Sequence, residues 1–133
     1  MKQIDHLEEI IRDSFGLWIT GLFDSIRHWN PTFSFDEHKA AFFDVVRQLL
    51  DDGKIMFIAP GADCYTSPAN PRPRYTIYDR DAQWHETPEE IIRQLRVQWP
   101  SHVCDANDAE LAVYFYMIPG VIWVGEGGEL YAS

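Results

Sequence analysis

Six side chains with metal-binding or nucleophilic chemistry are spread along the sequence without a spacing that joins them. The sequence has no C-x-x-C, H-x-x-x-H or HExxH pattern, the spacings typical of zinc sites. His102 and Cys104 supply two ligands without a second pair. We therefore predict no metal site among these six residues, which are His28, His38, His85, His102, Cys64 and Cys104.

The same residues give no pattern typical of catalysis. Cys104 follows His102 closely, but proximity in sequence does not orient a cysteine toward a histidine base. The acidic residues are numerous, and none is marked out by an apolar pocket. Gly125, Gly127 and Gly128 lie in a predicted hairpin turn, not between a strand and a helix, so they do not form a phosphate loop. We expect no enzyme activity, no catalytic residue and no cofactor.

Charge is the more informative property. The chain has 21 acidic and 11 basic residues, a net charge of −10. Nucleic-acid phosphates and anionic membranes both attract basic surfaces, so we expect neither as a direct partner. The charge suits a basic protein partner, or simply keeps the protein in solution. Residues 97–133 contain no Lys or Arg but five carboxylates, namely Asp105, Asp108, Glu110, Glu126 and Glu129.

Two aromatic residues lie in the same acidic stretch, within a predicted C-terminal hairpin. In its first strand Val121 and Trp123 share one face, and Ile122 and Val124 share the other. Tyr131 joins one of these faces from the second strand. One face must therefore meet solvent, another strand or a partner. We predict a partner surface with Trp123 or Tyr131 near its centre and the five carboxylates as its rim.

The chain length of 133 residues is typical of one domain, here residues 1–133. The longest apolar run, 111–119, is much shorter than the roughly 20 residues that cross a bilayer. The first residues lack the basic flank and apolar stretch of a signal peptide. With two cysteines only, we expect a cytoplasmic protein with free thiols.

Helix signals dominate the first half of the sequence. Ser34 and Glu37 form a capping box, Asn30-Pro31 ends the preceding helix, and Thr87-Pro88 is a typical helix start. Apolar residues at helical spacing follow each start. The segment 105–118 is compatible with a helix or a strand, and we favour a helix because acids crowd its first turn. The predicted helices span residues 4–13, 17–29, 35–52, 88–98 and 108–117.

Short apolar or alternating runs predict the strands. They lie near 54–59, 75–78, 82–85, 121–124 and 129–132, and a proline-rich loop covers 60–74. The predicted fold class is α+β: a mainly helical N-terminal half packs on a small antiparallel sheet that ends in a C-terminal β-hairpin. We expect a monomer or weak dimer.

Three segments, in this order, resemble a known family. They are FDEHKAAFFDVVRQLLDDGKI at 35–55, WHETPEEIIRQLRVQWP at 84–100 and PGVIWVGEGGELY at 119–131. The family consists of small acidic bacterial proteins of unassigned function, often encoded beside polymorphic toxins, including those of contact-dependent inhibition. The resemblance implies an immunity-type interaction protein. It carries over no functional residue, and the proline-rich loop is longer than the family's connection.

We therefore expect a cytoplasmic protein that binds a cognate toxin domain and blocks its active site. A nuclease toxin fits best, because its substrate cleft must be basic. The alternative is a domain that binds a small molecule or has a regulatory role. A helix-then-hairpin order is also found in winged-helix DNA-binding proteins, but the negative charge argues against that function.

Overall fold

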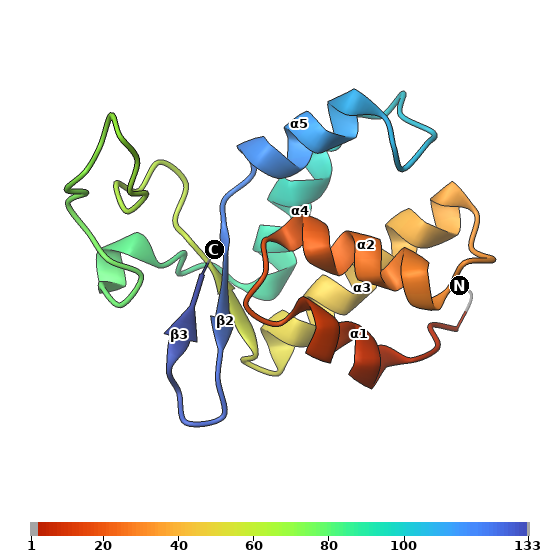
Figure 1. Ribbon diagram of the computed structural model, residues 1–133, viewed down its shortest axis with the longest axis horizontal. Coiled ribbons are helices and arrows are strands. Elements are labelled where there is room, and N and C mark those ends of the chain that lie inside the picture. The colour runs from red at the N-terminus through yellow and green to blue at the C-terminus, as the bar shows by residue number, and fades with distance from the viewer. Residues whose placement is uncertain (1–2, 133) are drawn as a thin grey trace.

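The computed structural model describes residues 3–132, which form an α+β fold of five α-helices and one antiparallel sheet (Figure 1). No helix in this part of the chain combines the length and apolar character needed to cross a membrane. In chain order the elements are α1 (Leu7–Ser14), α2 (Ile19–Trp29), α3 (Phe35–Asp51), β1 (Ile55–Phe57), the 3-10 turn η1 (Arg80–Ala82), α4 (Pro88–Val97), α5 (Ala109–Met117), β2 (Val121–Val124) and β3 (Leu130–Tyr131).

Helices α3 and α4 begin where the sequence predicted them, because local hydrogen bonds set their starts. The Ser34 hydroxyl accepts a hydrogen bond from the Glu37 amide, and the Glu37 carboxylate accepts one from the Ser34 amide. The Thr87 hydroxyl accepts from the Glu90 amide at the start of α4. These bonds satisfy donors that a bare helix end would leave unpaired, and at α3 they are reciprocal.

Helix α1 begins at Leu7, three residues later than the prediction of 4–13. His6 adopts a left-handed conformation with φ of 63°, which breaks the helical path. Asp5 is held instead by the buried side chain of Asn30. The Asp5 amide donates to Asn30 Oδ1 at 2.9 Å, and Asn30 Nδ2 donates to the Asp5 carbonyl at 3.0 Å. The contact of Asp5 with Asn30, 25 residues away in sequence, thus fixes where α1 starts.

The ambiguous segment near 108–117 is helical, as favoured from its acidic first turn. Its N-cap is Asp108, whose Oδ1 accepts from the Glu110 amide at 2.8 Å. Helix α5 ends at Met117 because Ile118 precedes Pro119 and is extended, with ψ of 159°. The proline ring disfavours a helical conformation in the residue before it.

The sheet has the order β1-β2-β3, and both strand pairs are antiparallel. Phe57 pairs with Val121 across β1 and β2, and Trp123 pairs with Tyr131 in the predicted C-terminal hairpin. Strand β2 is therefore the central strand. Val121, Ile122 and Trp123 are all buried, so both of its faces are covered.

The predicted strands at 75–78 and 82–85 are wrong. Residues 75–78 form a turn in which the Thr76 amide donates to the Asp79 carboxylate at 2.6 Å. The turn η1 follows at once, and only one isolated bridge, between Ile58 and Gln83, joins the second segment to the edge of β1. Both segments belong to the long connection that lies beyond the sheet, on the left of Figure 1.

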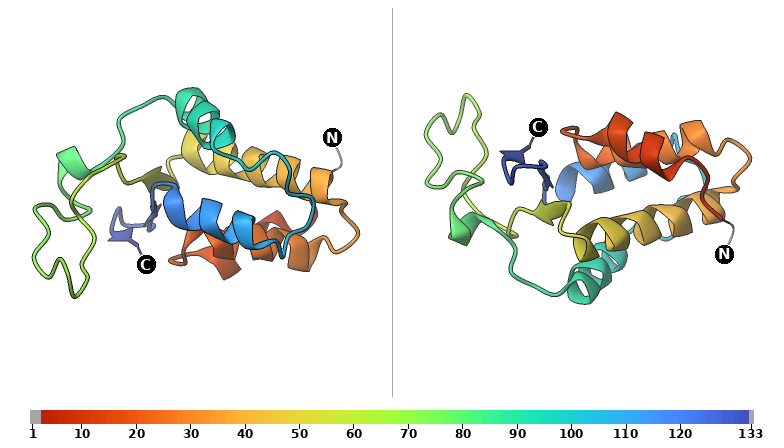
Figure 2. Two further views of the ribbon diagram at one scale, coloured as in Figure 1. Left: turned by 90° about the horizontal axis from the view of Figure 1, so that it is seen from above. Right: turned by 90° about the horizontal axis from the view of Figure 1, so that it is seen from below.

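An aromatic cluster holds the helices together. Figure 2 shows α3 between the α1–α2 pair and α4, with the sheet at one end of the helices. At the centre, Phe42 is fully buried, and its ring lies 5.5 Å from both Phe23 and Phe115 and 6.4 Å from Trp99. Aromatic pairs at such distances add to the stability that burial gives.

His38 lies within this core, and its burial leads us to expect that the stability of the protein depends on pH. Its ring is 2% exposed and stacks on Phe23 at 3.7 Å, and its Nε2 lies 2.7 Å from the Phe23 carbonyl. A carbonyl only accepts, so the neutral ring donates from Nε2. Burial lowers the pKa of His38 below 6.5, more than the hydrogen bond to Phe23 raises it. Below pH 6.5 the unfolded chain therefore binds a proton that the folded chain does not.

We expect the free energy of unfolding to fall as the pH drops below 6.5, by at most about 1.4 kcal/mol per pH unit from this group. Above pH 6.5 the contribution should be constant. Urea unfolding at several pH values between 5 and 8 measures it. His38→Gln is the control and should be less stable throughout but should lose this slope. An identical slope in both proteins would assign the pH dependence to other groups.

Candidate functional site: an aromatic groove beside helix α5

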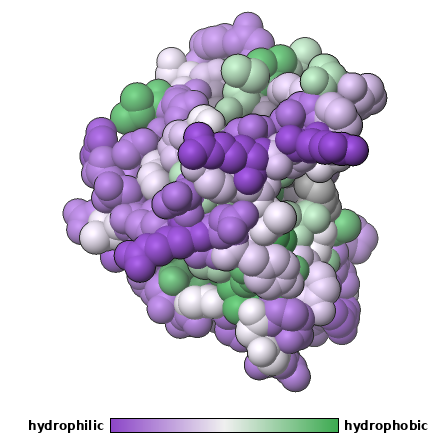
Figure 3. Space-filling view, turned by 90° about the vertical axis from the view of Figure 1, so that its left-hand side faces the viewer, coloured by the Kyte–Doolittle hydropathy of each residue, from purple (hydrophilic) through white to green (hydrophobic). Residues whose placement is uncertain are grey.

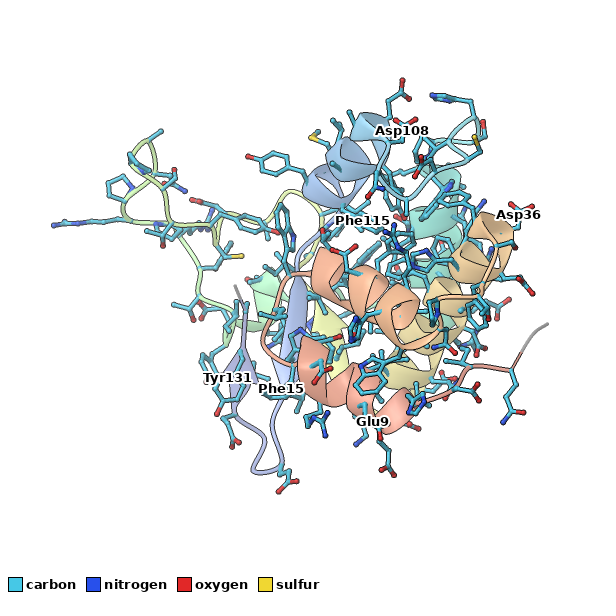
Figure 4. The ribbon with its side chains drawn as sticks, turned by 45° about the vertical axis from the view of Figure 1, so that its right-hand side comes forward. Glu9, Phe15, Asp36, Asp108, Phe115 and Tyr131 are labelled. Carbon is cyan, nitrogen blue, oxygen red and sulfur yellow. The ribbon has the colours of Figure 1, made fainter. Side chains whose placement is uncertain are left out.

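The five carboxylates predicted as a rim do not lie on one surface. Asp105, Asp108 and Glu110 lie at the start of α5, whereas Glu126 and Glu129 lie in the hairpin turn. Figure 1 shows these two regions on opposite sides of the molecule, and Figure 4 places Asp108 and Tyr131 at opposite ends of the view. A single partner surface cannot be built from all five with Tyr131 at its centre.

The three carboxylates at α5 also have local structural roles. Asp105 Oδ1 accepts from the Asn107 amide at 2.9 Å, and Asp108 caps the helix. The Glu110 carboxylate contacts Nε2 of His102. Within residues 3–132, no three His, Cys, Asp or Glu side chains are grouped so that they could hold a metal ion.

Trp123 was predicted as an exposed anchor, and the structure corrects this. Its side chain is 1% exposed, and its Nε1 donates to the Leu17 carbonyl at 2.8 Å. The alternation along β2 identified two faces, but not that β2 is the central strand, which is buried on both. Tyr131 is 44% exposed, and its ring lies 5.3 Å from Phe15, edge to face.

A groove of about 630 Å³ opens beside the end of α5, where the sequence predicted no site. Its aromatic walls are Trp18 before α2, Tyr65 from the long connection, and Tyr116 on α5. None of the described residues that line it is Asp, Glu, Lys, Arg or His. Concave apolar surfaces of this size with a few polar groups are typical of binding sites. We call this region the aromatic groove.

Trp18 is placed by the connection between α1 and α2. The hydrogen bond from Trp123 to the Leu17 carbonyl ties that connection to the sheet. The Trp18 ring then meets Tyr116 edge to face at 5.7 Å, and both stay exposed, at 41% and 71%. Buried Trp123 therefore contributes to the groove by positioning Trp18 and does not itself present a binding surface.

Tyr65 forms the opposite wall through one long-range hydrogen bond. The Gly120 amide donates to the Tyr65 hydroxyl at 3.0 Å. Burial raises the pKa of Tyr65, and this hydrogen bond only partly offsets the effect. The hydroxyl therefore keeps its proton and can donate to a bound group. A Cβ at Gly120 would lie 3.1 Å from that hydroxyl, a tight contact that would require Tyr65 to shift slightly.

The proline-rich loop 60–74 that carries Tyr65 is ordered around one carboxylate. Asn70 Nδ2 donates to Asp63 Oδ1 at 2.7 Å, and the Arg74 amide donates to Asp63 Oδ2 at 3.0 Å. These donors lower the pKa of Asp63, the Asn70 side chain most of all. Burial, with a smaller contribution from the Asp63 charge, raises the pKa of the neighbouring Cys64 thiol, which disfavours a reactive thiolate.

A second, smaller cavity of about 360 Å³ lies between α4 and α5. Its lining includes Glu110 and Val113, and it shares Gln98 and Met117 with the aromatic groove. Three apolar residues of α5 that line these cavities are strongly exposed: Val113 by 59%, Tyr116 by 71% and Met117 by 68%. We call these three residues the α5 apolar face.

This face could have been found in the sequence. Helix α5 contains one charged residue, Glu110, and its other eight residues are apolar or aromatic on every side. A helix that is apolar all round is expected to be buried, yet only one side of α5 packs on the core. Figure 3, which faces the end of the molecule with the long connection, shows hydrophobic side chains among hydrophilic ones.

No family model matches the sequence, and no curated protein matches it. Among solved structures, an uncharacterized protein conserved in bacteria, from Neisseria meningitidis, has a similar fold with a TM-score of 0.64. The two sequences are 20% identical, and the similarity covers 96% of this chain and 86% of the Neisseria chain. At that identity the similarity establishes a shared fold over nearly the whole length of both chains.

Proposed function

We propose that this protein is an immunity-type protein that binds a cognate toxin domain and neutralises it by covering its active site. The observation that carries the proposal is the α5 apolar face beside the aromatic groove. Val113, Tyr116 and Met117 leave large apolar side chains in solvent on a chain that is otherwise rich in charge. Exposed apolar surface bordered by polar residues is characteristic of protein-binding sites.

The net charge of −10 favours a basic partner. A nuclease toxin needs a basic cleft for its substrate phosphates, and an acidic inhibitor can associate rapidly with such a cleft. The protein itself then neither binds nucleic acid directly nor catalyses a reaction, and it needs no cofactor. It acts as a monomer or weak dimer in the cytoplasm.

The resemblance of segments 35–55, 84–100 and 119–131 to toxin-associated acidic bacterial proteins supports the same function. The first segment contains α3 and reaches the start of β1, the second contains α4, and the third contains the β2–β3 hairpin. Helix α5 lies outside all three. A partner-binding helix outside the shared segments would fit a protein whose partner differs from one system to another.

The test is co-expression of this protein with a toxin domain encoded by a neighbouring gene, if one is found there. Cells that express the toxin should survive only when this protein is present, and the purified proteins should form a complex. Association should slow as salt is added, because steering between opposite charges is screened. Survival without a complex, or a complex that leaves the toxin active, would contradict the proposal.

A second candidate function is binding of a small molecule, and the aromatic groove favours it. Its volume of about 630 Å³ and uncharged lining suit a neutral, planar ligand. Screening a library of neutral aromatic fragments by thermal shift distinguishes the two functions. A fragment that raises the melting temperature of the wild type but not of Tyr65→Ala would support this candidate, provided that the unliganded variant has a normal melting temperature.

A further inference from the structure

The aromatic groove and the smaller cavity lie next to each other along α5 and share two lining residues. Gln98 on α4 and Met117 on α5 line both cavities. On the α5 side, Glu110, Val113 and Met117 follow one another at helical spacing and share one face. On the α4 side, Gln94 and Gln98 are also one turn apart. We call the two cavities together the α4–α5 groove.

Its chemistry changes from one end to the other. The end at Trp18, Tyr65 and Tyr116 is aromatic and uncharged. The other end contains Glu110, whose side chain is 59% exposed and is the one charged side chain among the described residues that line either cavity. Glu110 and Tyr116 are six residues apart on α5, which corresponds to about 9 Å along the helix axis.

We infer that the α4–α5 groove binds a segment of a partner protein that places an apolar or aromatic side chain at the aromatic end and a Lys or Arg beside Glu110. The inference rests on the proposed function, because the partner is the toxin domain. Three residues of extended chain span about 10 Å, so the two side chains need be only three positions apart.

Charge selects this occupant over a second copy of the chain. Two copies would bring together proteins of net charge −10 each, with Glu110 directly at the contact. Among residues 3–132, no Lys or Arg lines either cavity to offset the repulsion. A neutral small molecule would fill the aromatic end but would give the Glu110 carboxylate no charged ligand beyond the exposed His102 ring that it already contacts. A segment that combines apolar and basic side chains satisfies both ends.

The test uses a blocked hexapeptide, Gly-Trp-Gly-Gly-Lys-Gly, titrated into the full ¹⁵N-labelled chain and followed by amide chemical shifts. The largest shifts should fall on residues 110–120. Replacing the peptide's Trp by Ala should abolish them, because the aromatic anchor supplies most of the affinity. Replacing its Lys by Glu should weaken binding about two- to fivefold, as expected for one exposed ion pair.

The matched protein variants are Glu110→Gln and Glu126→Gln, which each remove one exposed carboxylate from the segment without Lys or Arg. The first should weaken binding of the Lys peptide about two- to fivefold, and the second should leave it unchanged. Equal affinity for the Lys and Glu peptides, or shifts centred on the hairpin, would overturn the inference. So would shifts at 110–120 that depend on protein concentration without peptide, which would assign the groove to a second copy.

The inference and the proposed function fail in different ways. If the toxin encoded beside this gene is neutralised but the peptides show no preference, the function stands and the groove assignment falls. If the Trp and Lys peptide binds as expected but no toxin is neutralised, the groove binds a partner of this chemistry and the immunity function falls.

Discussion

Phe42→Ala should lower the free energy of unfolding by about 3–5 kcal/mol, the cost of truncating a fully buried Phe. Phe42 is 0% exposed, and its ring also lies 5.2 Å from Phe43 in addition to Phe23, Phe115 and Trp99. These rings come from three helices and from the segment after α4. The smaller side chain would leave a cavity that rigid neighbouring rings cannot close. Urea unfolding at neutral pH measures the loss.

Phe35→Ala is the matched control, since Phe35 begins the same helix but is only partly buried. It should cost clearly less than Phe42→Ala, because solvent already reaches its ring. Equal losses for the two variants, or an unchanged melting temperature for Phe42→Ala, would mean that the centre of the core lies elsewhere.

The helices could be predicted because the information that fixes them is local. Ser34 and Glu37 are three residues apart, and so are Thr87 and Glu90. The start of α1 could not be predicted in the same way. It depends on Asn30, which lies 25 residues from Asp5 and binds it only after α2 has packed against α1.

The errors in the sheet have a related cause. The alternation at 75–78 and 82–85 suggested strands, but strand pairing is decided by which segments meet in space. The turn at Thr76 and Asp79 and the turn η1 leave only Gln83 paired with the edge of β1. Likewise, nothing within 121–132 indicates that β1 pairs on the far side of β2 and makes Trp123 a core residue.

The candidate site was missed because its walls are distant in sequence. Trp18, Tyr65 and Tyr116 line one groove, and hydrogen bonds of Trp123 to Leu17 and of Gly120 to Tyr65 help to place them by joining residues 106 and 55 positions apart. What the sequence did contain was the composition of α5. Eight uncharged residues around one Glu are more apolar than one buried side of a helix requires.

Tyr116→Ala should weaken binding of the cognate toxin by at least about 2 kcal/mol, which is about thirtyfold in Kd. Tyr116 is 71% exposed, contacts Trp18 and lies at the aromatic end of the α4–α5 groove. The loss should appear mainly as faster dissociation, since a short-range apolar contact does not steer association. The fold should not suffer, because alanine is favourable in a helix and little buried area is lost.

Val97→Ala is the matched control for this variant. Val97 is 72% exposed on α4 and lines neither cavity, so its truncation should change toxin binding by less than about 0.5 kcal/mol. Both variants should unfold at the same urea concentration as the wild type to within the error of the measurement. Surface plasmon resonance with immobilised toxin then separates association from dissociation.

Charge reversal at Glu110 should change the association rate constant rather than the dissociation rate constant. Glu110→Lys should slow association with a basic toxin, and added salt should shrink the difference from the wild type. If Tyr116→Ala binds normally while Tyr131→Ala does not, the hairpin carries the contact, as the sequence first suggested. If neither matters and association ignores salt and Glu110→Lys, the acidic side chains of α3 become the surface to test, namely Asp36, Asp44 and Asp51, together with its C-cap Asp52.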